Sequence, residues 1–260
     1  MPDPALTTLL PALRAVALEA GAVILRYYAE GTGVDTKADG SPVTEADRAA
    51  EAVILPVLRA LLPGVPVVAE EAAAAGDIPE VGDDGRFWLV DPLDGTREFI
   101  GRNGEFTVNI ALIEAGRPVL GVVLAPVPGD LYAGAEDAGA VLSRAGGPDR
   151  PITARPAPDT GWIAVGSRSH GDRGAEAEYL AAFPVAERRS RGSSLKFCLL
   201  AEGAADIYPR FGPTCEWDTA AGHAVLAAAG GRVDLIGGGP LRYGKPGFRN
   251  PHFVAFGRAG

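Results

Sequence analysis

The chain has 260 residues, 47% of them hydrophobic, and carries a formal net charge of −9 with a pI near 4.9. This length and apolar content suffice for one large domain or two domains of ordinary size with a buried core. The acidic balance argues against nucleic-acid polymers and anionic membrane surfaces as partners, because either would need a basic face, but a small anion is allowed if metal ions offset its charge.

Cysteine content and the N-terminal segment bear on location. Cys198 and Cys215 are too few for a disulfide framework and predict free thiols in a reducing compartment. The N-terminal segment lacks the basic start of a signal peptide, and Arg14 and Glu19 interrupt its apolar run, which argues against integral membrane association. We therefore expect a soluble cytoplasmic protein, monomer or homodimer, and leave open a peripheral contact at the cytoplasmic face of the inner membrane.

Apolar residues at helical spacing predict that the chain opens with an amphipathic helix at residues 5–28. A loop at residues 31–43 follows, after which Thr44 and Asp47 are placed to begin a helix at residues 45–62. Taken alone, Asp47 is explained as a first-turn carboxylate that the helix dipole favours.

Two short apolar strands then run into acidic residues. The first, residues 66–69, ends in Glu70 and Glu71. The second, residues 87–90, should stop at Asp91, because the proline that follows has no amide proton for the ladder. On their own, acids in such positions are ordinary solvated surface residues.

The segment Asp94-Gly95-Thr96 reads as a turn that opens a short helix at residues 96–100. A helix start aims free backbone N–H groups at whatever the neighbouring carboxylates hold. A metal ion and a phosphate could therefore meet at this turn.

The second half of the chain changes pattern twice. Between residues 106 and 144, apolar runs joined by short glycine-containing turns predict an antiparallel meander. Residues 146–161 are rich in proline and poor in apolar residues, and so mark a domain boundary. Beyond it strands and helices alternate as in an α/β layer. The predicted strands are residues 162–166, 185–189, 206–209 and 233–236, and the predicted helices are residues 175–183, 194–202 and 219–229.

Four acids lie at ends of predicted elements, where a carboxylate can project without burying its charge in the core: Glu70, Asp91, Asp94 and Asp218. Asp218 alone is explained as the N-cap of the last helix. Together, an all-oxygen set suits Mg²⁺ or Mn²⁺ rather than zinc, and the spacing of the histidines builds no nitrogen site. Two such ions about 4 Å apart could clamp the attacking and leaving oxygens of a phosphoryl displacement. The carboxylates alone do not separate catalysis from passive cation binding.

Six segments carry a resemblance to a known family. VVAEE, WLVDPLDGTREF and WDTAAGHAVLAAAGG are similar to the signature segments of the lithium-sensitive, magnesium-dependent phosphatases typified by inositol monophosphatase. RNGEFTVNIALIEAG, GSSLKFCLLAEG and YPRFGPT resemble more closely one branch, the bacterial 3′(2′),5′-bisphosphate nucleotidases, which remove the 3′-phosphate of adenosine 3′,5′-bisphosphate in nucleotide and sulfur metabolism. The resemblance extends from the first helix to about His252.

The resemblance implies a layered αβαβα sandwich of mixed α+β and α/β class. Residues 1–150 would form an N-terminal α+β domain with the meander and most metal ligands. Residues 151–260 would form a C-terminal α/β domain that completes the metal site and the substrate pocket. The implied cofactor is Mg²⁺, two or three ions, with Mn²⁺ as a substitute, and the implied partner is a small nucleoside bisphosphate.

Site residues are carried over position by position from the same resemblance. The metal ligands would be Glu70, Asp91, Leu93 through its carbonyl, Asp94 and Asp218. The catalytic residues would be Glu70 and the pair that orients the attacking water, Asp47 and Thr96. The substrate-binding residues would be Glu70, Leu93, Asp94, Gly95, Thr96, Ser193, Ser194, Lys196, Arg210 and Asp218. The implied reaction is in-line attack by water, with no covalent enzyme intermediate.

Two other functions remain open. An inositol monophosphatase or sugar-bisphosphate phosphatase would share the metal centre; it is distinguished at residues 192–198 and 209–214, where hydroxyls and cations suit a second phosphate. For Lys196 and Arg210, surface solvation is an equally simple explanation. A non-catalytic cation or nucleotide sensor is the other alternative, but it would have no need of Asp47 beside Thr96.

Overall fold

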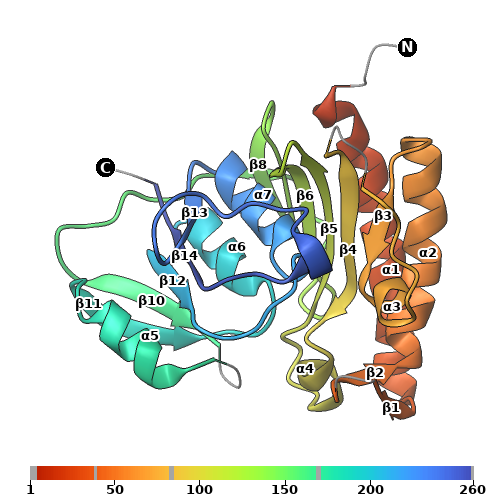
Figure 1. Cartoon of the computed structure of the whole chain (residues 1–260), viewed down its shortest axis with the longest axis horizontal. Coiled ribbons are helices and arrows are strands. Elements are labelled where there is room, and N and C mark those ends of the chain that lie inside the picture. The colour runs from red at the N-terminus through yellow and green to blue at the C-terminus, as the bar shows by residue number, and fades with distance from the viewer. Residues whose placement is uncertain (1–4, 38–39, 82–84, 168–170, 259–260) are drawn as a thin grey trace.

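The computed structural model describes residues 5–37, 40–81, 85–167 and 171–258 and stacks them in five layers (Figure 1). Helices α1 (Leu6–Glu30) and α2 (Glu45–Leu61) cover one face of a seven-stranded sheet. Helices α6 (Leu195–Ala201) and α7 (Ala220–Ala228) lie between this sheet and a five-stranded sheet, and α5 (Arg173–Leu180) packs against the second sheet from outside. This is the αβαβα sandwich that the sequence predicts, so the fold class is confirmed.

The seven-stranded sheet contains the predicted meander. Its strands are neighbours in chain order and are antiparallel except for the first, parallel pair. They are β3 (Val67–Ala69), β4 (Phe87–Asp94), β5 (Thr107–Glu114), β6 (Arg117–Ala125), β7 (Asp130–Ala135), β8 (Gly139–Arg144) and β9 (Arg150–Ile152). The prediction that β4 stops at Asp91 is wrong: its pairing with β5 is interrupted after Asp91 and resumes at Asp94. An irregularity of this kind accommodates a proline, because the residue there is left out of the ladder.

The five-stranded sheet has the order β11-β10-β12-β14-β13. Its members are β10 (Trp162–Gly166), β11 (Val185–Ser190), β12 (Ile207–Arg210), β13 (Arg232–Leu235) and β14 (Phe253–Phe256). The first three strands are parallel, as the alternation of strands and helices predicts, and β14 is antiparallel to both its neighbours. The sequence analysis missed β14, and it missed that β9 adds a strand to the first sheet within the proline-rich segment. The division into two domains near residue 150 stays a prediction.

The remaining elements are short. The segment expected to be a loop instead pairs β1 (Val34–Thr36) with β2 (Pro42–Thr44). The sequence analysis missed β1 because the strand is exposed along its whole length and shows no apolar alternation. Helices α3 (Glu70–Ala74) and α4 (Thr96–Ile100) follow directly on β3 and β4, and a 3₁₀ turn, η1 (Pro246–Phe248), precedes β14. Both strands that were predicted to end in acidic residues are thus followed directly by a short helix, and because β3 and β4 are parallel the two helices start at the same edge of the sheet.

Helix α1 is the one helix, among those that the structure describes, that is long and apolar enough to cross a membrane by length and composition. The expectation that Arg14 and Glu19 rule this out is therefore wrong on that criterion. In the structure the helix packs against α2 and β6, and its buried residues include Leu13, Ala17 and Ile24. This is the environment of a core helix.

Glycines bring α7 close to the first sheet. A Cβ at Gly121 of β6 would lie 2.5 Å from the carbonyl oxygen of Ala221, and one at Gly134 of β7 would lie 2.9 Å from the Cβ of Ala228. Larger residues would push the helix away. Its start, immediately after Asp218, is thereby held against the strands that carry the other acids.

Candidate active site

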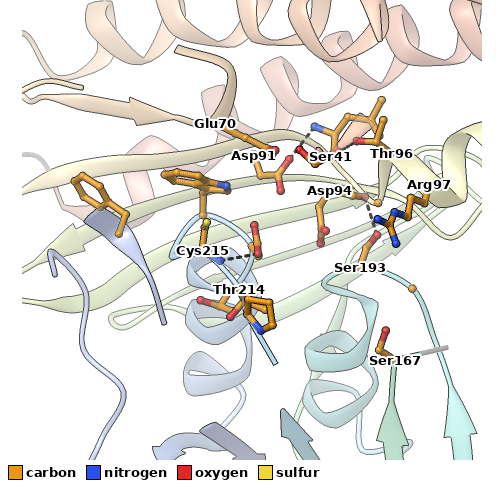
Figure 2. A pocket seen from close by; sticks show the side chains of 18 of the residues that line it. Ser41, Glu70, Asp91, Asp94, Thr96, Arg97, Ser167, Ser193, Thr214 and Cys215 are labelled. Carbon is orange, nitrogen blue, oxygen red and sulfur yellow. Dashed lines mark hydrogen bonds between the residues drawn. The ribbon is translucent and has the colours of Figure 1, made fainter. Parts of the chain in front are cut away.

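A cavity of about 490 Å³ opens where β3 and β4 end and where the segments leading into α6 and α7 begin (Figure 2). The residues predicted to form the site that line it are Glu70, Asp91, Leu93, Asp94, Gly95, Thr96, Ser193, Lys196, Arg210 and Asp218. Asp47 and Ser194 are not in its lining, and Asp47 reaches it through Thr96. Residues as far apart in the chain as Glu70 and Asp218 thus share one cavity.

The four acids repel one another. Burial, and then the charges of Glu70 and Asp94, raise the pKa of Asp91 well above its ordinary value. Burial and the charges of Asp94 and Glu70 likewise raise the pKa of Asp218. Burial raises the pKa of Asp94 to about 6, although Lys196 opposes the shift. Crowded carboxylates of this kind are stabilised as anions only by a cation between them.

Backbone and amide donors hold one oxygen of each aspartate. Asp91 Oδ1 accepts from the N–H of Leu93 at 3.0 Å, and Asp94 Oδ2 accepts from Asn109 Nδ2 at 3.3 Å. Asp218 Oδ2 accepts from the N–H of Cys215 at 2.8 Å. Because Asp218 therefore bonds backward along the chain and no side chain caps α7, the N-cap explanation of Asp218 is wrong.

Asp47 serves two partners at once. Its Oδ2 accepts from the N–H and the hydroxyl of Thr44, at 2.8 and 2.7 Å, which completes a capping box at the start of α2. Its Oδ1 accepts from Thr96 Oγ1 at 3.1 Å. The helix-start explanation and the pairing with Thr96 are therefore both features of the structure, each using a different oxygen.

Lys37, which the sequence analysis did not single out, lies against the acids. Its Nζ is 2.7 Å from Glu70 Oε1 and 2.6 Å from Glu71 Oε1. Burial opposes the shift, but the charge of Glu70 and the bonds to both carboxylates raise the pKa of Lys37. A signal was present: the chain has only three lysines, and a compact ammonium fits between two carboxylates better than a guanidinium does.

The donor set fits a hard divalent cation. The four acids and the carbonyl of Leu93 offer oxygen only, and the ammonium of Lys37 lies against Glu70. Within the described residues, no three acidic, histidine or cysteine side chains stand in a ready-made ligating arrangement. Of the histidines, His223 and His252 do not line the cavity, and His170 lies outside the described residues.

Two buried cations, Lys196 and Arg210, are among the residues that line the same cavity. Lys196 is 6% exposed and Arg210 is 7% exposed, so the explanation of these residues by surface solvation is wrong. Lys196 Nζ donates to the carbonyl of Ser193 at 2.6 Å, and Arg210 Nη2 donates to the carbonyl of Pro213 at 3.1 Å. Burial lowers the pKa of Lys196 to about 8, although Asp94 opposes the shift.

The hydroxyl groups of the two serines form hydrogen bonds with backbone carbonyl oxygens. Ser193 Oγ lies 2.7 Å from the carbonyl oxygen of Asp94 and 2.9 Å from that of Glu105. Ser194 Oγ donates to the carbonyl of Asp218 at 2.8 Å and accepts from Asn109 at 3.0 Å. The serines therefore link α6 to two of the predicted metal ligands, and their contact with substrate stays a prediction.

Asn109 and an aromatic pair were also missed. Asn109, 1% exposed in β5, bonds both Asp94 and Ser194, and its signal was an amide in the middle of the apolar run TVNIALI. Trp217 and Phe248 line the cavity with ring centroids 6.3 Å apart. Nothing in their local sequence distinguishes these rings from core aromatics.

The inositol monophosphatase family matches residues 5–253. The chain belongs to this family. It is 51% identical over 242 residues to the 3′(2′),5′-bisphosphate nucleotidase CysQ of Escherichia coli K12, covering 92% of this chain and 95% of that protein. It is 43% identical over 230 residues to the CysQ of Buchnera aphidicola, covering 88% and 84%.

Solved structures of the family have the same architecture. The crystal structure of CysQ from Bacteroides thetaiotaomicron is similar with a TM-score of 0.79 and 42% identity, covering 96% of this chain and 97% of that chain. An inositol monophosphatase from Anabaena gives 0.77 and 29%, covering 96% and 91%. The predicted family and the prediction of an enzyme, a phosphatase, are confirmed; the family implies a divalent metal cofactor and a small phosphate-bearing substrate.

The raised carboxyl pKa values predict how pH governs stabilisation by Mg²⁺. The pKa of Asp94 is about 6 in the folded protein against an ordinary 3.8, so the folded state keeps a proton that the unfolded state loses. In EDTA the free energy of unfolding should therefore fall as pH rises from about 4 to about 6. A divalent cation such as Mg²⁺ would bind only the deprotonated acids, so the gain in Tm on adding Mg²⁺ should be small near pH 5 and several degrees near pH 7.5. Thermal melts with Mg²⁺ or EDTA test this; an equal gain at both pH values contradicts it.

Proposed function

We propose that this protein is a magnesium-dependent phosphatase that removes the 3′-phosphate of adenosine 3′,5′-bisphosphate, giving AMP and inorganic phosphate. One observation carries the proposal: the cavity that collects the four acids proposed as metal ligands also contains two buried cations, Lys196 and Arg210. A metal-binding acid cluster suits the phosphate that reacts, and separate cations suit a second phosphate that does not. The name of the CysQ relatives supports the same substrate class.

The proposed metal ligands are the side chains of Glu70, Asp91, Asp94 and Asp218 and the carbonyl of Leu93. Mg²⁺ held there would supply Lewis-acid polarisation of the phosphate and lower the pKa of a bound water. The chain's own carboxylates keep this site anionic, and Glu70, which exchanges between Lys37 and the cavity contents in this proposal, is the ligand with a ready alternative partner.

Asp47 and Thr96 are proposed to orient the attacking water. Thr96 donates its single hydroxyl proton to Asp47 Oδ1 at 3.1 Å, the carbonyl of Leu93 being farther at 3.4 Å, which leaves the lone pairs of Thr96 Oγ1 to accept a hydrogen bond from water. Asp47 is anchored to Thr44 through its other oxygen, so this direction is maintained. The pair also separates an enzyme from a passive cation sensor, which would have no need of it.

Gly95 and Thr96 are proposed to offer backbone N–H groups to the reacting phosphate. Gly95 begins α4 in a left-handed conformation, φ 95°. A Cβ at this position would lie 2.4 Å from Ser193 Oγ, so glycine is required both for the conformation and for the close approach of α6. The approach brings the proposed phosphate donors and Lys196 to one cavity.

Substrate specificity provides the direct test. With Mg²⁺ present, phosphate release should be fastest from adenosine 3′,5′-bisphosphate in a panel that includes inositol 1-phosphate and fructose 1,6-bisphosphate. Preference for inositol 1-phosphate would instead favour the inositol monophosphatase function, to which the similarity with the Anabaena structure also points. We further propose that Mn²⁺ can replace Mg²⁺, that Li⁺ inhibits by competing at a metal position, and that the protein works in the cytoplasm in nucleotide and sulfur metabolism.

Removing either buried cation should weaken selection for a second phosphate. Lys196→Met and Arg210→Met keep the side-chain bulk and delete the charge. The transition-state stabilisation calculated from kcat/KM for adenosine 3′,5′-bisphosphate should therefore fall by about 1.5–3 kcal/mol, the usual value of a hydrogen bond to a charged group. Hydrolysis of adenosine 3′-monophosphate should change little. The measurement is the ratio of the two kcat/KM values in each variant, with the exposed Arg150→Met as control. A ratio that stays at the wild-type value in both variants would place the second phosphate elsewhere.

A further inference from the structure

A second cavity, of about 310 Å³, lies along α7, between the start of β6 and the segment that follows β13. It shares no lining residue with the catalytic cavity. The proposed function uses none of the residues that surround it. Its lining combines an apolar wall, a buried histidine and two arginines.

His223 is the buried polar group of this lining. It is 8% exposed, and burial lowers its pKa to about 3, so its ring is neutral at physiological pH. Its Nδ1 lies 3.0 Å from the hydroxyl oxygen of Tyr243. Its Nε2 has no hydrogen-bond partner within the described part of the chain. A neutral imidazole of this kind either donates or accepts at the free nitrogen, depending on which nitrogen holds the proton.

The hydrogen bonds behind His223 favour one tautomer of its ring. Thr219 donates its one hydroxyl proton to the carbonyl of Glu216 at 3.2 Å, so Thr219 Oγ1 accepts from Tyr243 at 3.3 Å and from Asn250 at 3.0 Å. Tyr243 has then used its own proton and must accept from His223. With these bond directions the imidazole proton is on Nδ1 and Nε2 offers a lone pair to the cavity, the tautomer that the proposal below uses and its test measures.

The two arginines of the lining differ in whether a carboxylate neutralises them. Arg117 is neutralised by Glu136, with Nη1 3.0 Å from Oε1. Arg242 has no carboxylate partner among the described residues, and its positive charge adds to the effect of burial in lowering the pKa of His223. The apolar wall is contributed chiefly by Ala224, Ala227 and Leu241. The cavity thus presents the His223 ring, the Arg117–Glu136 ion pair, the charge of Arg242 and an apolar surface.

We propose that this cavity is a binding site for a small hydroxy carboxylic acid. The hydroxyl of the ligand donates to His223 Nε2, its carboxylate pairs with Arg242, and its apolar body packs against Ala227 and Leu241. The volume of about 310 Å³ accommodates a small ligand, and the lining offers polar groups for its hydroxyl and carboxylate beside an apolar wall for its body.

Three aromatic probes of one shape test the proposal on the full chain. Mandelate has both groups, phenylacetate lacks the hydroxyl, and mandelamide lacks the charge. The ring ¹⁵N resonances of His223 report binding at this cavity separately from the catalytic cavity. Mandelate should shift them, and phenylacetate and mandelamide should each bind roughly 2- to 10-fold more weakly, the worth of one hydrogen bond. The spectrum without ligand should show Nε2 unprotonated.

Variants separate this site from the catalytic one. Arg242→Ala should weaken mandelate binding roughly fivefold or more while phosphatase activity stays unchanged, because the lost contact is charge-assisted and lies outside the catalytic cavity. Arg150→Ala, at another exposed arginine, should change neither. The proposal is overturned if mandelate leaves the His223 resonances unmoved, if phenylacetate binds as tightly as mandelate, if Arg242→Ala binds normally, or if Nε2 carries the proton.

Discussion

Asp91→Asn and Asp94→Asn are each expected to reduce Mg²⁺-dependent phosphate release by roughly 10³-fold, since each removes one of the charges that hold the ion which stabilises the transition state. An amide keeps the shape of the carboxylate and can still accept the bond from Leu93 or Asn109. The fold should therefore survive, and circular dichroism should match the wild type.

Stability in EDTA should move in the opposite direction from activity. Burial and neighbouring acids raise the pKa values of Asp91 and Asp94. Replacing either residue by a neutral amide therefore relieves electrostatic repulsion in the site. The Tm in EDTA at neutral pH should rise, while the stabilisation by Mg²⁺ should largely disappear. Asp137→Asn, on an exposed turn, is the matched control and should change neither quantity. Full activity of either site variant, or undiminished wild-type activity in excess EDTA, would refute the metal assignment.

Thr96→Ala and Asp47→Asn are expected to lower kcat by about 10²-fold or more with little change in KM, because orientation of the water matters chiefly in the transition state. Mg²⁺ affinity, measured by calorimetry, should be nearly unchanged, since neither residue is a proposed ligand. Thr96→Ser, which restores the hydroxyl, should recover most of the lost rate.

The double role of Asp47 provides the control. Thr44→Val removes the hydroxyl that bonds Asp47 Oδ2 in the capping box but leaves the Thr96 bond to Oδ1 in place. It should cost about 1 kcal/mol of unfolding free energy, the usual value of a cap, with kcat close to wild type. If Thr44→Val lowers kcat as much as Thr96→Ala does, capping rather than water orientation explains the effect.

Local periodicity in the sequence was enough to locate the longer regular elements. The spacing of apolar residues located α1 and α2 within two residues at each end, and Thr96–Ile100 was predicted with its observed limits. The meander β5 to β8 followed from alternating runs and glycine turns. The acids were found because they stand at ends of elements and within recognisable segments. All of these signals lie within about a dozen neighbouring residues.

Which side chains share a site depends on the tertiary structure and could not be read from local sequence. Thr96 bonds Asp47 across 49 residues, Lys37 bonds Glu70 across 33, and Ser193 bonds the carbonyl of Asp94 across 99. Such contacts depend on sheet order and on the stacking of layers, to which no local period refers. The same holds for β14, whose place between β12 and β13 is set by pairing with both. Burial of Lys196 and Arg210, and the second cavity along α7, likewise arise only when the two sheets close on the helices between them.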